Sequence, residues 1–416
     1  MTNEHEVSIS PYPYGKSFAF TIIDDTDRST LETCRPVYDF LISTGLRTTK
    51  TVWVREARTK NDEDDYGDTT ERGEYLAYLK ELQKLGFEIA LHNVSSDDNS
   101  REDIISGIEK FKEHFGDYPS INVMHDENKE NIYFDAFLEY GYISRPFYTK
   151  YLSAIYEWYI HRKKIRDRWT GGKRFFGEDE SSPYFWGDIC KEKVRYVRSY
   201  INYPELNTLK CNPDIPYHER EKPYVNYWFD GSNGEDCEHF NRLLSLENIN
   251  QLVDQGGCAI VYTHFGRGFV TREDDGQYRL DDETKHVLQT VSILDGWFVP
   301  VSEMLDRLRV TRNVKVFGGK ELLVANLNDA PVDGLTLNTK SSNRYRAHTG
   351  KVFIADDRGR IVIDRLRPNE CLLLESAPVG EGTESKTRYW QDQNRSHVFL
   401  DGRTILRKLS KAFGYK

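Results

Sequence analysis

Acidic and histidine side chains follow several strand-like runs of this sequence. Asp24 and Asp25 come directly after the run 17–23, whose aromatic and β-branched residues predict a buried strand. Two carboxylates beside a core are costly unless they bind a cation or take part in proton transfer. The same placement recurs after later strand-like runs for His92, His125, Asp230 and His264. A lone histidine is more often structural than a ligand, but this ordered set favours a common site for metal-assisted or acid–base chemistry.

The elements that would position these side chains alternate between strands and helices. A helix is expected over about 30–44, ending at Gly45, and another opens at Ser100, which forms a capping box with Asp103. The strand-like runs lie at 49–54, 87–91, 121–124, 142–144, 194–197, 225–229 and 258–263. This alternation predicts a parallel sheet or barrel, and α/β barrels keep their sites at the carboxyl ends of the strands.

A second, smaller module is predicted after the barrel. From about residue 312 the pattern changes to short strands separated by turns, which predicts an all-β, sandwich-like domain. We therefore expect a barrel over 1–311 with an irregular insertion at about 150–225, a β module over 312–376, and a linker and tail over 377–416.

The composition excludes several classes of protein. The net charge of −10 offers no basic stripe for nucleic acid. No stretch approaches the ~20 apolar residues of a membrane span, and the polar N-terminus is unlike a secretory signal. Six scattered cysteines without a CxxC pair fit reduced thiols in the cytoplasm. A basic run at 404–409 could form an amphipathic helix that contacts an anionic membrane or, as we favour, another part of the protein.

Taken in order, these motifs resemble those of the polysaccharide deacetylases, also called carbohydrate esterase family 4. The family carries a strand followed by Asp-Asp, then a His-Ser/Thr-x-x-His motif, an Arg-x-Pro-Tyr motif with a glycine–proline lead-in, a Trp/Asp segment and a Leu-x-His motif. The similar segments here are 21–25, 91–96, 116–119, 228–230 and 262–264. The resemblance covers roughly residues 15–300 and implies a deformed (β/α) barrel, followed here by the small all-β domain.

The resemblance also implies roles for individual residues. Asp24 would be the general base, Asp25 and His92 metal ligands, His264 the general acid, and Asp230 a further catalytic residue. A divalent cation polarises an amide carbonyl and lowers the pKa of water, while the acid and base move protons. The implied function is therefore a metal-dependent hydrolase that removes an acetyl group from an N-acetylated sugar or glycan precursor.

The sequence departs from the family pattern at two loops. Ser96 stands where the second metal histidine would fall, whereas His125 occupies the position of the third motif. We expect His125 to replace the missing ligand, giving a site of Asp25, His92 and His125. Two imidazoles and one carboxylate suit zinc or iron, and we favour zinc. The alternatives are that Ser96 or water completes the site, or that the metal has been lost.

Three further side chains are candidates for substrate binding. Trp186 lies in an aromatic loop and could stack on a sugar ring, or belong to a packed insertion. Arg145 opens an Arg-Pro-Phe-Tyr run that matches the third motif one helix too late, so chance similarity is an equal reading. Arg267 lies between two glycines after His264 and could hold a phosphate or carboxylate.

Two alternatives to the sugar deacetylase remain open at this point. The altered metal motif could indicate another metal-assisted C–N hydrolase on the same barrel. The barrel and the β module could instead form a non-catalytic carbohydrate-binding protein. The lack of an export signal suggests a cytoplasmic substrate, such as a nucleotide- or lipid-linked precursor of a surface polysaccharide.

Overall fold

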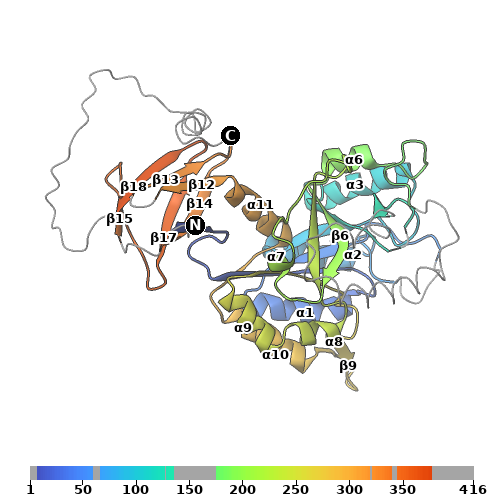
Figure 1. Ribbon diagram of the computed structural model, residues 1–416. Helices are drawn as coiled ribbons and strands as arrows, with labels where there is room; N and C mark the ends of the chain where they lie inside the picture. The colour runs from blue at the N-terminus through green and yellow to red at the C-terminus, as the bar shows by residue number, and fades with distance from the viewer. Residues whose placement is uncertain are drawn as a thin grey trace, which may run out of the picture. The chain divides into compact units, whose positions relative to one another are not determined.

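The chain divides into two compact units, shown in the computed structural model of Figure 1. One unit is Phe18–Met304, and the other joins Met1–Ser17 to Leu305–Lys416. The structure describes residues 7–59, 66–126, 128–134, 175–318, 321–339 and 344–376. The strand predicted at 142–144 and the tail 377–416 lie outside these residues. Within them, none of the helices is both long and apolar enough to cross a membrane.

Seven parallel strands close into a barrel in the larger unit. They run in the order β2-β3-β4-β5-β6-β7-β8, and β8 pairs back to β2, while β11 pairs with the first three residues of β2. Their bounds are β2 Phe18–Asp24, β3 Thr49–Val52, β4 Glu88–His92, β5 Ile121–Val123, β6 Tyr196–Tyr203, β7 Tyr227–Asn233, β8 Cys258–Thr263 and β11 Gly296–Phe298. The predicted deformed (β/α) barrel is confirmed, and β6 shows that part of the expected irregular insertion is a barrel strand.

Strand β2 is the central element of this sheet. It pairs with β3, β8 and β11, and all seven of its residues are buried. A strand covered on both faces needs a continuous apolar run, which explains why this segment lacks the alternation of a half-exposed strand. The strand ends at Asp24, so the acidic pair lies at the carboxyl edge of the barrel, as predicted.

Two of the predicted helices begin at a capping residue and end at a glycine. Thr30 caps α1 (Leu31–Thr44), which stops at Gly45 with φ 76°. The capping box of Ser100 and Asp103 is present at the start of α3 (Arg101–Phe115). The other helices are α2 Gly73–Lys84, α6 Gly187–Lys193, α7 Thr208–Cys211, α8 Cys237–Leu243, α9 Leu246–Asp254, α10 Asp282–Ser292 and α11 Val301–Arg312. Helices α1, α9 and α10 lie together on one side of the barrel (Figure 1), next to the hairpin of β9 Val270–Arg272 and β10 Tyr278–Leu280.

The smaller unit contains two antiparallel sheets, as expected for a sandwich-like module. Their orders are β1-β14-β17 and β12-β13-β18-β15-β16. The bounds are β1 Val7–Ser10, β12 Val314–Gly318, β13 Glu321–Asn326, β14 Val332–Thr339, β15 Arg344–Ala347, β16 Val352–Ile354, β17 Arg360–Leu366 and β18 Cys371–Ser376. Strand β1 hydrogen-bonds to β14, so the first strand belongs to this unit and not to the barrel. The predicted boundary missed this because strand pairing across more than 300 residues leaves no local signal.

We predict that Gly107→Ala destabilises the barrel whereas Gly73→Ala does not. A Cβ on Gly107 in α3 would lie 2.7 Å from the Cβ of Val94, which is buried, whereas a Cβ on Gly73 in α2 would meet nothing within 4 Å. Overpacking of this kind costs about 1–3 kcal/mol, while an exposed helical Gly→Ala change is neutral or slightly favourable. Urea unfolding of both variants checks this, and equal midpoints would contradict the packing argument.

Candidate active site

The predicted site residues that the structure describes lie near the carboxyl edge of the barrel, but they belong to different clusters. Asp24 and His92 are the last residues of β2 and β4, and His264 directly follows β8. Asp230 lies inside β7, because that strand continues three residues beyond it to Asn233. Arg145 lies outside the described residues.

Asp24 is enclosed by an ion pair with Lys50. Its carboxylate lies 2.9 Å from the Lys50 ammonium, and neither side chain is exposed. The Tyr38 hydroxyl donates to the same carboxylate at 3.0 Å, and the Phe265 main-chain N–H donates at 2.8 Å. Burial alone would lower the pKa of Lys50, but the adjacent Asp24 carboxylate raises it above its usual value. The predicted base is therefore shut away from solvent in this structure.

Lys50 also holds the turn that follows Asp24. Its ammonium donates to the Ser29 hydroxyl at 3.2 Å and to the Asp25 carbonyl at 3.5 Å. The residues between these two contacts include Asp27. Lys50 thus attaches this turn to β3, a role that the sequence reasoning did not assign. A lysine inside an otherwise strand-like run was the available signal, since a buried ammonium needs an anionic partner.

Asp25 is paired with Arg198 from β6. The guanidinium donates to both carboxylate oxygens, at 2.9 and 2.7 Å, and both side chains are buried. The Arg198 guanidinium also lies 4.3 Å from the ring centre of Tyr262. A bidentate pair of this kind already uses one lone pair on each oxygen of Asp25 and compensates the carboxylate charge. The ligand role of Asp25 stays a prediction, and the structure offers another carboxylate closer to the histidines.

That carboxylate is Asp27, which all three predicted histidines approach. One oxygen lies 3.1 Å from His92 Nε2 and 3.9 Å from His125 Nε2, and the other lies 3.0 Å from His264 Nε2. Arg267 approaches the second oxygen at 3.3 Å. Burial by itself would raise the pKa of Asp27, but the charge of His92 and the hydrogen bonds of His264 and His92 hold it well below its usual range.

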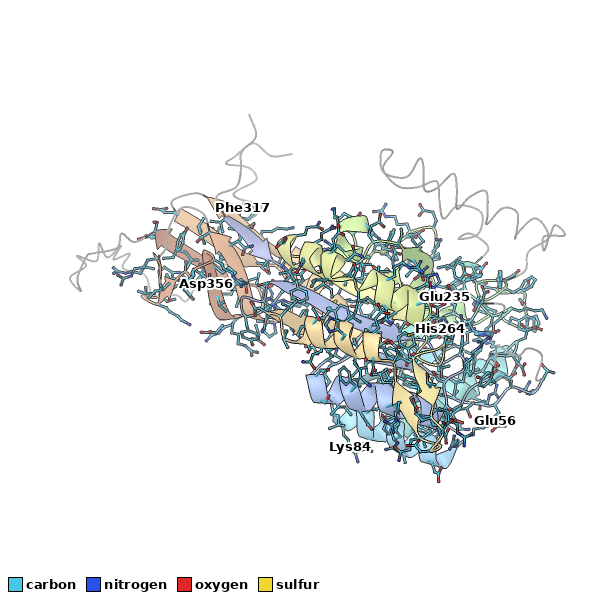
Figure 2. The ribbon with its side chains drawn as sticks, turned by 90° about the horizontal axis from the view of Figure 1, so that it is seen from below. Glu56, Lys84, Glu235, His264, Phe317 and Asp356 are labelled. Atoms are coloured by element: carbon cyan, nitrogen blue, oxygen red, sulfur yellow. The ribbon has the colours of Figure 1, made fainter. Side chains whose placement is uncertain are left out.

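The other ring nitrogen of each histidine faces an acceptor. His92 Nδ1 lies 3.2 Å from the Val123 carbonyl, and His264 Nδ1 lies 2.8 Å from the Glu235 carbonyl. Glu235 and His264 lie beside each other in Figure 2. A carbonyl can only accept, so both rings carry a proton on Nδ1. In the neutral form of each ring, the lone pair is therefore on Nε2 and faces Asp27.

His125 Nδ1 also faces an acceptor, but here the acceptor belongs to a side chain. Its Nδ1 lies 2.8 Å from the Asn128 amide oxygen. Each neutral imidazole would thus direct a lone pair at the Asp27 carboxylate, which is unfavourable, and each ring that is protonated instead adds a positive charge beside Arg267. A cation among these groups would relieve both conflicts. Metal-binding histidines are held in this way, with the outer N–H donated to a carbonyl or carboxylate.

The side chains do not close around a single point as they stand. Among the described residues, no group of three or more His, Cys, Asp or Glu is arranged to hold a metal ion. Two ligands at about 2.1 Å from a tetrahedral ion lie about 3.4 Å apart. The Asp27–imidazole separations of 3.0, 3.1 and 3.9 Å bracket that value. Two imidazoles and a carboxylate are donors that suit a zinc-like cation, so the donor types fit a metal although the side chains are not closed around one.

Trp53 forms an apolar wall for two of the histidines. Its ring stacks on His92 with centroids 6.0 Å apart and meets the His125 ring edge-on at 5.6 Å. Trp53 is 2% exposed, so it keeps water away from this side of the imidazoles. Sequence reasoning placed it in a strand but gave it no role in the site.

Asp230 is held by a separate set of neutral donors. The hydroxyls of Ser199, Tyr203 and Tyr217 donate to it at 2.5, 2.8 and 2.9 Å, and the Asn212 amide donates at 2.8 Å. Its exposed fraction is zero. These hydrogen bonds give Asp230 a structural role. The predicted catalytic role would require some of them to break.

The other two substrate-binding candidates differ in exposure. Trp186 is 2% exposed and belongs to the core, and its indole N–H donates to the Glu130 carbonyl at 2.6 Å. No face of the ring is open to a sugar, so the packed reading of this loop fits the structure. Arg267 is 24% exposed and bridges Asp27 and Glu235, each at 3.3 Å. It therefore lies where a substrate group could reach it.

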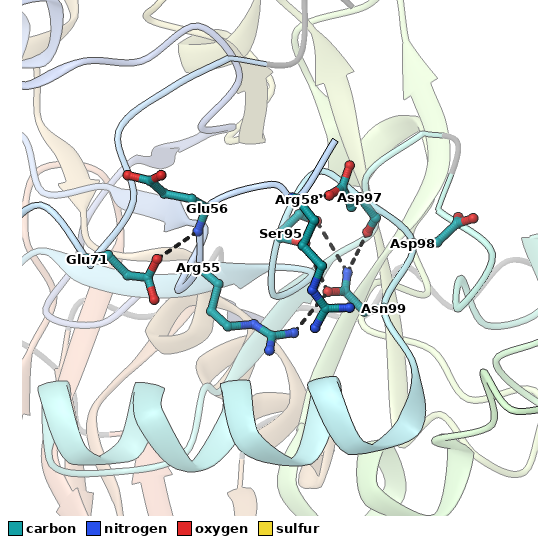
Figure 3. A pocket seen from close by; sticks show the side chains of 8 residues that line it. All are labelled: Arg55, Glu56, Arg58, Glu71, Ser95, Asp97, Asp98 and Asn99. Atoms are coloured by element: carbon teal, nitrogen blue, oxygen red, sulfur yellow. Dashed lines mark hydrogen bonds between the residues drawn. The ribbon is translucent and has the colours of Figure 1, made fainter. Parts of the chain in front are cut away.

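A polar pocket of about 190 Å³ opens beside the β3 and β4 loops (Figure 3). It is lined by Arg55, Glu56, Arg58, Glu71, Ser95, Asp97, Asp98 and Asn99. Both arginines donate to the same oxygen of Asp103, at 3.0 and 2.5 Å, so they share one carboxylate. Carboxylates outnumber guanidiniums in this lining, which makes the pocket unsuited to an anion.

Two residues of this pocket wall belong to a buried amide network around Glu130. The Glu130 carboxylate accepts from the amides of Asn93, Asn99 and Asn128 at 3.0, 2.7 and 2.8 Å, and from the Asn99 main-chain N–H at 3.0 Å. Ser95 donates to the Asn99 side chain at 2.9 Å. Burial raises the pKa of Glu130 to about 7, although these hydrogen bonds work to lower it.

No protein-family model and no curated protein matches the chain. Solved structures do resemble it. A Mycobacterium smegmatis protein provisionally named a polysaccharide deacetylase is 12% identical over 72% of this chain and 93% of that chain, with a TM-score of 0.40. Puue allantoinase is 10% identical over 73% and 94%, with a TM-score of 0.40. The catalytic domain of a peptidoglycan N-acetylglucosamine deacetylase from Eubacterium rectale ATCC 33656 is 11% identical over 70% and 90%, with a TM-score of 0.31.

Polysaccharide deacetylases, the family that the motifs predicted, are thus among the solved structures similar to this chain. All three TM-scores are below 0.5. The function therefore has to follow from the side chains of the site.

We predict that Lys50→Met lowers the free energy of unfolding by about 3–5 kcal/mol, because it leaves the Asp24 carboxylate buried without its partner. The double variant Asp24→Asn, Lys50→Met should regain part of this loss. Chemical denaturation of the two single variants and the double variant measures the coupling. Lys84→Met, at the exposed end of α2, is the control and should stay within about 0.5 kcal/mol of the wild type. A Lys50 variant as stable as this control would show that the buried Asp24 carboxylate does not need a cationic partner.

We also predict a pH dependence that belongs to Glu130. Its pKa rises from 4.5 to about 7 on folding. Its contribution to stability is therefore present below pH 4.5 and is lost as the pH rises through about 7. With 1.36 kcal/mol per pKa unit, the wild type should lose about 3 kcal/mol relative to Glu130→Gln between those limits.

Urea unfolding of both proteins from pH 4.5 to 8 tests this dependence. Glu102→Gln, on the exposed face of α3, serves as the control and should follow the wild type. Parallel curves for the wild type and Glu130→Gln would rule out a raised pKa at this residue.

Proposed function

We propose that this protein is a metal-dependent hydrolase that removes an acetyl group from an N-acetylated sugar or glycan precursor. The observation that carries the proposal is the approach of three imidazole Nε2 atoms to the Asp27 carboxylate near the carboxyl edge of the barrel. The motif order gives independent support, since it resembles that of polysaccharide deacetylases.

Asp27, His92 and His125 would hold the cation, with zinc as the proposed ion. Asp27 takes the place first predicted for Asp25, because Arg198 already neutralises Asp25. When bound, a divalent cation would polarise the amide carbonyl and lower the pKa of a nearby water. Two imidazoles and one carboxylate leave coordination positions open for these groups.

His264 would move the protons of the reaction. We favour it over Asp24 because Asp24 has no exposure and is tied to Lys50, whereas His264 Nε2 faces the cluster. His264 accepts a proton at Nε2 from the attacking water and returns it to the amine nitrogen as the C–N bond breaks. The products are a free amine and acetic acid, which loses its own proton to solvent. An imidazole suits both transfers because its usual pKa is near neutrality.

Arg267 would bind the substrate from the open side of the cluster. Its guanidinium is partly exposed and touches Asp27, so it lies next to the place where the amide would react. An acidic group on the substrate, such as a phosphate of a nucleotide- or lipid-linked sugar, would suit it. The scattered cysteines support a cytoplasmic location for this substrate.

We predict that the purified protein binds about one zinc ion per chain, and that Asp27→Asn, His92→Ala and His125→Ala each weaken this binding strongly. The reason is that each change removes one of the three proposed ligands. Metal analysis after zinc loading and dialysis measures it. His286→Ala, on the exposed face of α10, is the control and should leave the zinc content unchanged.

Acetate release from a panel of free and nucleotide-linked N-acetylhexosamines tests the reaction itself. His264→Asn should keep the zinc but lose about 10²–10⁴-fold in rate. A wild type that binds no zinc would count against the metal site. A zinc-loaded wild type that releases no acetate from any of these sugars would favour a different C–N hydrolase.

A further inference from the structure

Asn128 lies three residues after His125, and its amide orientation is fixed by its surroundings. The amide nitrogen donates to the main-chain carbonyls of Ser95 and Asp97 at 3.0 and 2.7 Å, and to the Glu130 carboxylate at 2.8 Å. All three partners are acceptors, so only the nitrogen of the amide can face them. Asn128 is also buried, which leaves no water to satisfy a flipped amide.

The oxygen of this amide must therefore face His125. It lies 2.8 Å from His125 Nδ1 and has no proton to give. Nδ1 has to carry the proton, and the lone pair of the neutral ring falls on Nε2. Nε2 is the atom that approaches Asp27.

We propose that Asn128 is a positioning residue that fixes the tautomer and the ring orientation of His125, so that Nε2 presents its lone pair toward Asp27. The use of that lone pair for a cation rests on the proposed function, but the tautomer itself does not.

Glu130 anchors Asn128 from the other side. Its carboxylate receives further N–H groups from Asn93 and Asn99, and it is 1% exposed. A flipped Asn128 amide would direct its oxygen at this carboxylate and at two carbonyls. Such a flip would exchange three attractive contacts for three repulsive ones, so the orientation is determined by the network and not by His125.

His125 differs from His92 and His264 in the acceptor that faces its Nδ1 atom. His92 and His264 are oriented by main-chain carbonyls, of Val123 and Glu235, which no side-chain substitution removes. The acceptor that faces His125 Nδ1 belongs to a side chain, the Asn128 amide. Asn128 can therefore be tested by mutation, whereas the other two acceptors cannot.

The test is long-range ¹H–¹⁵N NMR of the metal-free, full-length protein with ¹⁵N-labelled histidine at pH 8. In the wild type we expect His125 to show a protonated Nδ1 and an unprotonated Nε2. Asn128→Leu removes the acceptor, so the Nε2–H tautomer should become populated. A wild-type His125 with its proton on Nε2 would overturn the proposal without any variant.

Two further variants separate positioning from a general structural role. Asn99→Ala removes another asparagine amide that donates to the Glu130 carboxylate. The Asn99 amide is not the acceptor that faces His125 Nδ1, so this variant should leave the His125 tautomer unchanged. Asn128→Asp keeps one oxygen facing Nδ1 but turns its second oxygen toward the three acceptors, so it should keep the Nδ1–H tautomer while lowering the stability of the folded protein. If Asn128→Leu also retained the Nδ1–H tautomer, Asn128 would not be what sets it.

Zinc titration against a competing chelator links this inference to the proposed function. Loss of the partner that orients a metal ligand typically costs 10–100-fold in affinity, and we expect that loss for Asn128→Leu and not for Asn99→Ala. A wild type with the expected tautomer but no zinc binding would uphold the inference and reject the metal site. A zinc-binding wild type whose tautomer and affinity survive Asn128→Leu would do the reverse.

Discussion

The buried ion pair between Asp24 and Lys50 is the constraint on which the rest of the site depends. Lys50 also holds Ser29 and the Asp25 carbonyl, so the turn that carries Asp27 is attached to β3 on both sides of that residue. From the opposite direction, a Cβ on Gly266 would lie 2.7 Å from the Asp27 carbonyl oxygen, so the main chain after His264 packs directly on this turn. A buried pair contributes little net stability, but it fixes geometry once formed.

The histidines gain their common direction from acceptors outside the cluster. Each ring donates its Nδ1–H to an acceptor on the side away from Asp27. The Nε2 atom of each ring therefore faces Asp27. Trp53 covers His92 and His125 on one side, which limits competition from water. The cost of gathering lone pairs at a carboxylate in a dry place is the physical reason to expect a cation there.

The sequence was sufficient for the parts of the fold that local patterns encode. The buried run before Asp24 predicted β2, and the capping box at Ser100 predicted the start of α3. The pattern also brought together His92 and His125, whose rings lie 5.4 Å apart. It could not identify the carboxylate that meets them, because the path of the turn after β2 decides this and depends on Lys50, a long-range partner.

The pairing of charges explains why Asp24 and Asp25 do not contact the histidine cluster, whereas Asp27 does. Asp24 and Asp25 each have a dedicated buried cation, Lys50 and Arg198. Recruiting Asp25 to a metal would leave a buried guanidinium beside a second positive charge, at a cost of several kcal/mol. Asp27 lacks a dedicated buried cation, since its nearest partners are imidazoles that can be neutral and Arg267 is partly exposed and shared with Glu235. In the proposed function, these charge pairs therefore keep the two motif acids in the framework, and the acid two residues further on is the one proposed to bind the cation.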